Sequence, residues 1–303
     1  MQFVSIFLFW VFLGIGVFQF NFEQTLVAQS SVIRLDVNLV ELQARVTDQD
    51  NRSVSGLARR AFQLFVDDVA EPITVFRGED APVTAGIVVD NSASMAPKQS
   101  SVIEAALEFA RNSNSQDQMF VIHFSDQTRL GLPVDKLFTN DVAELESAIS
   151  KFDLGGTTSL YDAIFSAIEH LRHADFGRKV LLIVTDGRDN SSHANVADVI
   201  KKAQKEEILI FAVGLFDEAE SDRSSKALSQ LAQATGGQAY FPMPVTDITE
   251  TCRTIAREIR TQYTFAFIGA EDGKYHRIKV EAHDGKYEKL EVHTRRGYFA
   301  KSP

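Results

Sequence analysis

Five short, nearly continuous apolar runs constrain the fold of this chain more than any other feature of its sequence. They are TAGIVVD (84–90), QMFVIHFS (118–125), KVLLIVTD (179–186), ILIFAVGL (208–215) and QAYFP (238–242). Strands of this composition suit a parallel sheet that is covered on both faces. Segments with helical spacing separate the runs, for example with apolar residues at Val102, Ala105, Ala106 and Phe109. This alternation predicts a doubly wound α/β domain with a mostly parallel sheet.

The segments on either side of the α/β pattern have β-strand character. Residues 31–80 alternate apolar and polar side chains with period two, and clusters of polar turn residues interrupt the alternation. Residues 262–300 contain three more strand patterns, separated by the turns EDGK and DGK, which are hairpin signals of the Asp-Gly type. Each segment alone has too few strands to bury a face. We therefore expect both to form one small antiparallel β-sandwich-like domain into which the α/β domain is inserted.

The predicted domain organisation starts with a signal peptide or N-terminal anchor at 1–30. A first part of the β-domain (31–81), the α/β domain (82–261) and a second part of the β-domain (262–303) follow. The first 20 residues carry no charged side chain, as is typical of an export signal or a membrane anchor. The apolar run of about 18 residues is long enough to span a bilayer, whereas small residues at 26–30 favour cleavage. We expect an exported protein, periplasmic, envelope-bound or secreted, with a retained anchor as the alternative.

The balance of acidic and basic residues limits the classes of molecule that the chain is expected to bind. Forty-one acidic against thirty-one basic residues give a net charge of -10, which argues against nucleic acid as the partner and favours cations. Contact with a membrane is expected only through the N-terminal segment, if that segment is not cleaved. The single cysteine, Cys252, has no partner for an internal disulfide, and we expect it to be buried in a helix around 247–262.

Polar side chains follow two of the predicted central strands at the points where the strands end. Asp90, Ser92 and Ser94 come on alternate positions after the first run, and Asp186 ends the third. In open α/β sheets ligands bind outside the carboxyl ends of the strands, so these side chains are expected on one rim. In LGGTTSLYDAI (154–164) two glycines precede Thr157 and allow a tight backbone approach to the same rim.

These five residues, Asp90, Ser92, Ser94, Thr157 and Asp186, all offer oxygen ligands. Hard divalent cations require oxygen, so the set predicts Mg²⁺, with Mn²⁺ or Ca²⁺ as alternatives, and not zinc, which prefers sulfur and imidazole. Two carboxylates among neutral hydroxyls leave Mg²⁺ incompletely compensated and with an open octahedral position. A carboxylate from a protein partner would complete the coordination.

Each piece could also serve a purely structural role. Asp and Ser after a strand are common in helix caps and turns, and GGTTS and TDG could be ordinary loops. The coincidence of the three pieces at junctions of one α/β domain favours a metal site. Asp162, Asp189 and the pair Ser125-Asp126 lie near such junctions and are candidates of second rank. Asp162, on a helix, is expected to cap, pair or orient, whereas Asp189 could support the metal ligands from behind or be merely solvated.

At the motif level, Asp90-x-Ser92-x-Ser94, Gly155-Gly156-Thr157 and Thr185-Asp186-Gly187 resemble the metal-ion-dependent adhesion site of the von Willebrand factor A-type domain, also found as integrin I domains. The resemblance covers roughly residues 82–250. It implies that the serines and the threonine bind the metal directly, that at least one aspartate binds through water, and that an open–closed switch is coupled to the last helix, around 247–262. The flanking segments are similar to exported bacterial proteins called VWFA-related.

The leading functional hypothesis is a non-enzymatic adhesion or scaffold module that is divalent-metal-dependent and binds an acidic residue of a partner. The alternatives are a metal-dependent hydrolase of phosphate esters and a structural envelope subunit. Against the hydrolase, Ser92 stands where the aspartyl-phosphate pattern has a second acid, and the seven histidines form no recognisable motif.

Overall fold

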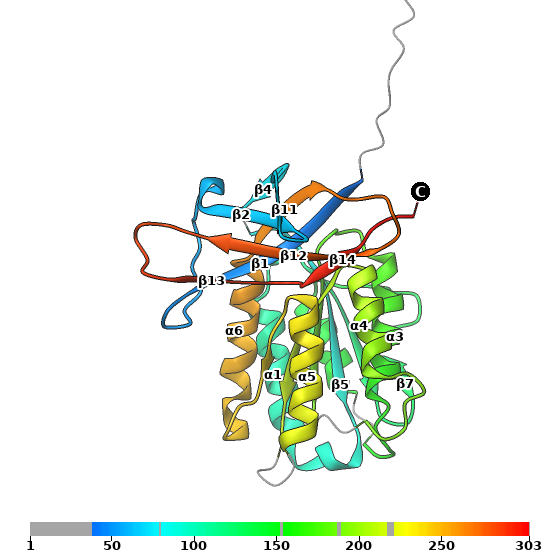
Figure 1. The fold of residues 1–303 in the computed structure, drawn as a ribbon. Helices are drawn as coiled ribbons and strands as arrows, with labels where there is room; N and C mark the ends of the chain where they lie inside the picture. The colour runs from blue at the N-terminus through cyan, green and yellow to red at the C-terminus, as the bar shows by residue number, and fades with distance from the viewer. Residues whose placement is uncertain (1–37, 79, 152–153, 187–188, 217–220, 303) are drawn as a thin grey trace, which may run out of the picture. The chain divides into compact units, whose positions relative to one another are not determined.

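A computed structural model describes residues 38–302, apart from residues 79, 152–153, 187–188 and 217–220 (Figure 1). The predicted signal or anchor segment at 1–30 lies outside the described residues. Over the described ranges the chain forms one mostly parallel sheet with helices and two antiparallel sheets, which confirms the predicted fold class. No helix in this part of the chain combines the length and apolar character needed to cross a membrane.

The central sheet has the strand order β10-β9-β8-β5-β6-β7, in which all neighbours are parallel except β6 and β7. Its strands are β5 (Thr84–Asp90), β6 (Gln118–Phe124), β7 (Thr128–Leu130), β8 (Lys179–Thr185), β9 (Ile208–Gly214) and β10 (Ala239–Tyr240). Every residue of β5 and β9 is buried. The continuous apolar runs therefore form the strands that are covered on both faces, as the sequence predicts.

Helices cover this sheet in two groups (Figure 1): α1 packs against α2 and α6, and α4 packs against α3 and α5. Their bounds are α1 (Gln99–Asn112), α2 (Val142–Ile149), α3 (Leu160–His170), α4 (Val196–Lys205), α5 (Ser221–Thr235) and α6 (Ile248–Arg260). Short 3-10 helices occur at η1 (Arg59–Ala61), η2 (Ala93–Lys98), η3 (Leu171–His173) and η4 (Val245–Asp247). The predicted apolar face of α1 is buried. Cys252 is buried in α6, and burial raises the pKa of its thiol to about 12.

The two antiparallel sheets have the orders β13-β1-β11-β4 and β14-β12-β2-β3. Their strands are β1 (Leu39–Asp48), β2 (Phe62–Val66), β3 (Val69–Glu71), β4 (Val75–Arg77), β11 (Tyr263–Ile268), β12 (Tyr275–Ala282), β13 (Leu290–Thr294) and β14 (Gly297–Phe299). Strand β1 pairs with β11, and β2 pairs with β12. Both sheets therefore combine strands from before and after the α/β segment, and an aromatic cluster around Phe62, Tyr263 and Phe265 fills the space between them.

The prediction of hairpins at the turns EDGK and DGK is wrong. Strands β11 and β12 flank the first turn but belong to different sheets, and so do β12 and β13 on either side of the second. The Asp-Gly signal specifies a reversal of the chain, but each reversal here crosses from one sheet of the sandwich to the other. The turn at Asp67-Asp68 does join paired strands, and both residues have the positive φ values, 48° and 67°, that a tight hairpin requires.

Candidate metal centre

The first loop of the candidate site begins at the end of β5. Asp90 is fully buried, and its Oδ1 accepts a hydrogen bond from the Ser92 backbone N–H at 2.8 Å, while its Oδ2 accepts one from the Thr185 hydroxyl at 2.6 Å. The chain then enters η2, and this turn brings the hydroxyl oxygens of Ser92 and Ser94 to 3.1 Å from each other. Ser92 is buried and Ser94 is exposed. The alternation of Asp90, Ser92 and Ser94 thus gathers their oxygens within one turn.

The end of β8 places Asp186 beside this loop. Strands β5 and β8 are parallel neighbours, with Val89 opposite Val184. Asp186 is 6% exposed, and its Oδ1 is buried without a hydrogen-bond partner among the described residues. A buried carboxylate oxygen without a partner is unusual in a folded protein, because it loses its hydration without compensation.

Burial raises the pKa of Asp90 to about 6, and the nearby charge of Asp186 contributes to the increase. The hydrogen bonds from Thr185 and Ser92 act in the opposite direction, because they stabilise the carboxylate. The two acids therefore form a closely spaced pair whose negative charge the chain only partly compensates. Such a pair is suited to receiving a cation.

The second loop is fixed against the first. The backbone N–H of Gly155 donates to the carbonyl of Asn91 at 3.0 Å. Gly156 has a φ of +78°, and a Cβ at this position would lie 2.7 Å from Asp126 Oδ1, so only glycine fits without a shift. Thr157 follows directly and its side chain is exposed. The second loop therefore lies against Asn91 of the first loop and against Asp126, and Thr157 lies on its exposed surface.

The third loop is joined to the second by hydrogen bonds in both directions. Asn190 Oδ1 accepts from the Thr158 backbone N–H at 2.9 Å, and the Asn190 N–H donates to the Thr158 carbonyl at 3.0 Å. Asp189 accepts from the Tyr161 N–H at 2.9 Å, close to the start of α3. Asp162 accepts from two consecutive backbone N–H groups, those of His193 and Ala194. Asp162 and Asp189 therefore hold the second and third loops together, which for Asp162 is the pairing role expected from the sequence.

Asn190 is a functional candidate that the sequence patterns do not single out. Its only sequence signal is its place in the polar run that follows Asp186, and such a run is common in loops. The remaining second-rank candidates form a local pair, in which the Ser125 hydroxyl donates to Asp126 at 3.0 Å. Asp126 packs against Gly156, as described above, and supports the second loop.

The chemistry of these residues fits a hard divalent cation. The oxygens at the rim are carboxylates and hydroxyls, and Asp186 Oδ1 has no other partner among the described residues. Within the described part of the chain, no three His, Cys, Asp or Glu side chains gather in a way that could hold a metal ion. A cation at this rim would therefore depend on the hydroxyls of Ser92, Ser94 and Thr157 as well as on the two acids.

Residues 86–258 match the von Willebrand factor type A domain. The chain belongs to this family. The von Willebrand factor type A domain is typically a protein-interaction or adhesion module, and the match covers the three loops described above.

Relatives share this domain at low identity. The chain is 25% identical over 190 residues to an uncharacterized protein of Borreliella burgdorferi, covering 60% of this chain and 55% of that protein. It is 26% identical over 163 residues to the human collagen alpha-1(XXI) chain, covering 51% of this chain and 16% of the collagen chain. The matches thus span about half of the first relative and a small part of the second.

A solved structure extends the likeness to the fold. The von Willebrand factor type A protein from Catenulispora acidiphila superimposes with a TM-score of 0.54 at 14% identity, covering 88% of this chain and 75% of that chain. At this identity the likeness concerns the fold alone.

Proposed function

We propose that this von Willebrand factor type A protein is a non-enzymatic adhesion or scaffold module whose binding of a protein partner depends on a divalent cation, Mg²⁺ before Mn²⁺ or Ca²⁺. Asp90, Ser92, Ser94, Thr157 and Asp186 would hold the cation. The observation that carries the proposal is the buried Asp186 Oδ1 without a hydrogen-bond partner among the described residues, beside a second buried acid. A cation would give Asp186 Oδ1 the partner that it lacks among the described residues, and it would compensate the charge of both acids.

The chain's own residues prepare such a site. Thr185 and the Ser92 N–H fix the orientation of the Asp90 carboxylate. Ser92, Ser94 and Thr157 contribute neutral oxygens, so the protein supplies two negative charges at most. When bound, Mg²⁺ would supply a directional Lewis-acid position for a carboxylate of the partner. This division of ligands favours capture of an acidic side chain over a saturated structural site.

The contacts of Ser92 and His123 give no support to a catalytic function. A serine nucleophile would need a base within hydrogen-bond reach. His123 Nε2 lies 2.8 Å from the Ala148 carbonyl, and its Nδ1 faces Asn91. The Ser92 hydroxyl faces the Ser94 hydroxyl. We therefore propose recognition as the function, outside the cytoplasm, as the N-terminal apolar segment suggests.

Calorimetric titration with Mg²⁺ and Mn²⁺ tests the metal site. We expect one site in the wild-type chain, and a Kd raised more than about tenfold by Asp186→Asn or by Thr157→Ala, because each removes a ligand. Asp135→Asn is a matched control, because Asp135 is exposed and distant in sequence from the three loops, and the substitution removes the same charge. Unchanged binding in both site variants would refute the assignment.

A capture experiment tests the dependence of partner binding on the metal. Immobilised wild-type chain should retain an envelope protein in Mg²⁺ and release it in EDTA, and the Asp186→Asn chain should not retain it. Mutation of an acidic residue in the captured protein should also abolish retention. Retention that persists in EDTA would instead assign recognition to the β-sandwich and contradict the proposal.

A further inference from the structure

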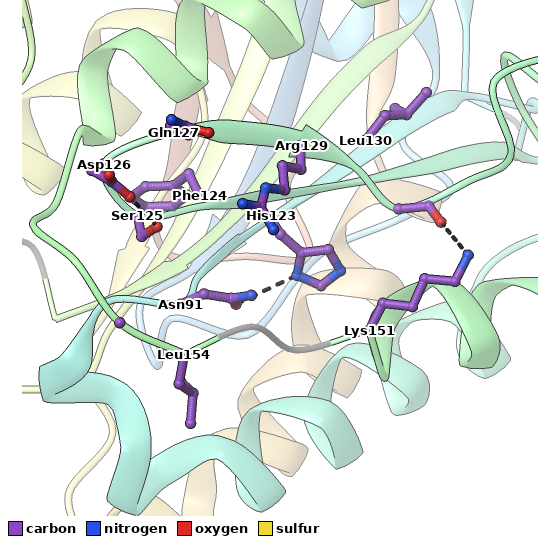
Figure 2. Close-up of a pocket in the computed structure, with 12 residues that line it drawn as sticks. Asn91, His123, Phe124, Ser125, Asp126, Gln127, Arg129, Leu130, Lys151 and Leu154 are labelled. Carbon is purple, nitrogen blue, oxygen red and sulfur yellow. Dashed lines mark hydrogen bonds between the residues drawn. The ribbon is translucent and has the colours of Figure 1, made fainter.

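A pocket of about 450 Å³ lies directly beside the candidate metal centre (Figure 2). Asn91 and Gly155, which belong to the first and second loops, form one side of it. The segment from His123 to Gly131, which includes the turn between β6 and β7, forms the other. Its volume lies within the roughly 300–1,000 Å³ of small-ligand sites. A segment of a partner that reaches the metal centre would pass this pocket.

Two of the buried side chains that line the pocket, Asn91 and His123, are polar and uncharged. Asn91 is 3% exposed and His123 is 5% exposed. Figure 2 shows the His123 ring facing the Asn91 amide, and its Nε2 donates to the Ala148 carbonyl at 2.8 Å. Burial lowers the pKa of His123, so the ring is neutral at physiological pH. These residues provide hydrogen-bonding groups without attracting or repelling a charge.

The rim of the pocket is both apolar and charged. Leu130 and Leu154 are each 37% exposed and supply apolar surface to the pocket. Lys151 donates one hydrogen bond to the Gly131 carbonyl at 3.0 Å, and an ammonium group has three N–H donors. Arg129 also lines the pocket, but it already has an interaction within the chain. Lys151 is therefore the cation that can receive an incoming anion.

The charges of the pocket are separated. Asp126 lines the pocket next to Gly156, on the side of the second metal loop. Lys151 lies on the opposite side in Figure 2, near the Gly131 carbonyl. A carboxylate entering the pocket would be repelled from Asp126 and attracted to Lys151. Leu130 and Leu154 also line the pocket and offer apolar surface to an aliphatic stem.

We propose that this pocket receives a glutamate side chain from the same partner segment whose acidic residue binds at the metal centre. The glutamate stem would contact Leu130 and Leu154, and its carboxylate would pair with Lys151. The inference rests on the proposed function and adds to it a partner with two acidic residues at a fixed spacing. It favours glutamate over aspartate, because the shorter side chain offers less stem to the leucines.

Binding of synthetic peptides to the full chain tests this pairing. Each peptide has a central aspartate among glycine and serine residues, and a single glutamate is moved through the neighbouring positions. Fluorescence anisotropy measures Kd in Mg²⁺ and in EDTA. We expect glutamate at one preferred spacing to lower Kd about fivefold in Mg²⁺, as for a partly exposed ion pair. Glutamine at that position should abolish the gain.

Variants of the chain test whether Lys151 is responsible for the tighter binding of the glutamate peptide. Lys151→Gln should remove the benefit of the glutamate and leave Kd for the glutamate-free peptide unchanged. Lys201→Gln, an exposed lysine on α4 outside the pocket, should retain the benefit. A benefit that survives Lys151→Gln, or Mg²⁺-dependent binding without any glutamate preference, would overturn the inference alone. Absence of Mg²⁺-dependent binding of every peptide would overturn the proposed function together with it.

Discussion

Asp90 combines complete burial with a negative charge, and this combination opposes stability when no cation is bound. Its pKa is raised from 3.8 to about 6, chiefly by burial. A raised folded-state pKa means that the carboxyl group contributes stability below pH 3.8, and that this contribution is lost as the pH rises through about 6. At neutral pH the difference between the two pKa values of Asp90 corresponds to roughly 3 kcal/mol of destabilisation.

Asp90→Asn should therefore stabilise the metal-free chain at alkaline pH. The amide can still accept from the Ser92 N–H and donate to the Thr185 oxygen, so the local geometry has a replacement for both bonds. We expect urea unfolding in EDTA at pH 8 to show a gain of up to about 3 kcal/mol, which shrinks towards pH 4. The control Asp135→Asn should show no such trend. An Asp90→Asn effect of equal size at both pH values would contradict the argument.

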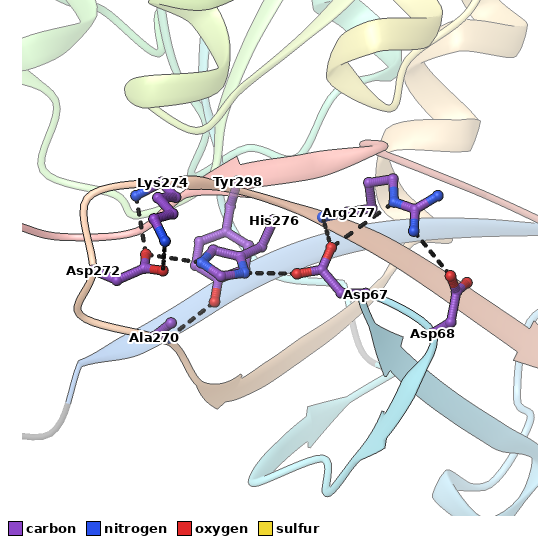
Figure 3. Close-up of polar contacts among 8 residues, drawn as sticks. All are labelled: Asp67, Asp68, Ala270, Asp272, Lys274, His276, Arg277 and Tyr298. Atoms are coloured by element: carbon purple, nitrogen blue, oxygen red, sulfur yellow. Dashed lines mark hydrogen bonds and ion pairs between the residues drawn. The ribbon is translucent and has the colours of Figure 1, made fainter.

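At the scale of elements, His276 on β12 holds two loops of the sandwich together (Figure 3). Its Nδ1 lies 2.8 Å from Asp67 Oδ2 in the β2–β3 turn, and its Nε2 lies 2.9 Å from Asp272 Oδ1 in the β11–β12 connection. The ring stacks on Tyr298. Both nitrogens can donate only in the imidazolium form, so the complete arrangement requires a protonated ring.

The charged groups around this ring define its pH dependence. Hydrogen bonds with Asp272 and Asp67 raise the pKa of His276 above 6.5, so its contribution to stability is present below pH 6.5 and is lost as the pH rises through the higher folded-state value. The pKa of Asp272 is lowered, first by His276, and that of Asp67 is lowered, first by the Arg277 backbone N–H. Their contributions are present above pH 3.8 and are lost in acid. Lys274 and Arg277 are the nearby cations.

His276→Gln should consequently reduce the loss of stability between pH 6 and pH 9. We expect the melting temperature of the wild-type chain to fall more steeply over this interval than that of the variant, because only the wild type loses an imidazolium between two carboxylates. Thermal unfolding followed by circular dichroism measures the difference. His283→Gln is the control, since the His283 side chain is 79% exposed. Parallel pH profiles for the wild type and His276→Gln would refute the proposed role of the ring.

Elements with strong local signals are predictable from the sequence. Strands β5, β6, β8 and β9 coincide with predicted strands, because an unbroken apolar run between turn residues is typical of a buried strand. Strand β7 has no such signal, because its three residues are largely exposed and show no periodicity. The partners of β11, β12 and β13 differ from the prediction, because turn residues specify a reversal but not the sheet in which the next strand pairs.

The candidate site also has a part that the sequence predicts and a part that it does not. Asp90 and Asp186 are predicted on one rim because the strands they follow are expected to be parallel members of one sheet, and β5 and β8 are indeed neighbours. The contact of Asn190 with Thr158 and the approach of His123 to Asn91 join residues far apart in the chain. No local pattern encodes these contacts, since they arise from the packing of loops. The role of the five residues as metal ligands stays a prediction.

At the scale of the whole molecule, two buried arginines lie where the sandwich and the α/β domain join. Arg178 donates to the Ala81 carbonyl at 3.0 Å and to the Ile259 carbonyl at 2.6 Å, so it ties the chain shortly before β5 to the end of α6. Arg45 on β1 pairs with Glu258 of α6 at 3.0 Å, and the Tyr240 hydroxyl donates to the same carboxylate at 2.6 Å. Since β11 follows α6 directly, the sandwich is fixed to this helix through side chains and through the chain itself.

Arg45→Met should be strongly destabilising, because it leaves Glu258 buried without its cation. The side chains of Arg45 and Glu258 are only 4% and 8% exposed, and breaking such a pair typically costs about 3 to 5 kcal/mol. Urea unfolding at pH 8 measures the loss. The penalty should shrink in acid, because burial already raises the pKa of Glu258 and protonation removes the unpaired charge.

The double variant Arg45→Met/Glu258→Gln separates the unpaired charge from the loss of packing. The introduced glutamine is neutral and could still accept from the Tyr240 hydroxyl, so we expect at least half of the lost stability to return. Arg52→Met is the matched control, because the Arg52 side chain is 71% exposed in its pair with Asp48 and such a pair contributes less than about 1 kcal/mol. If the double variant were as unstable as Arg45→Met, the loss would come from packing of the arginine stem. The junction would then depend on shape and not on charge.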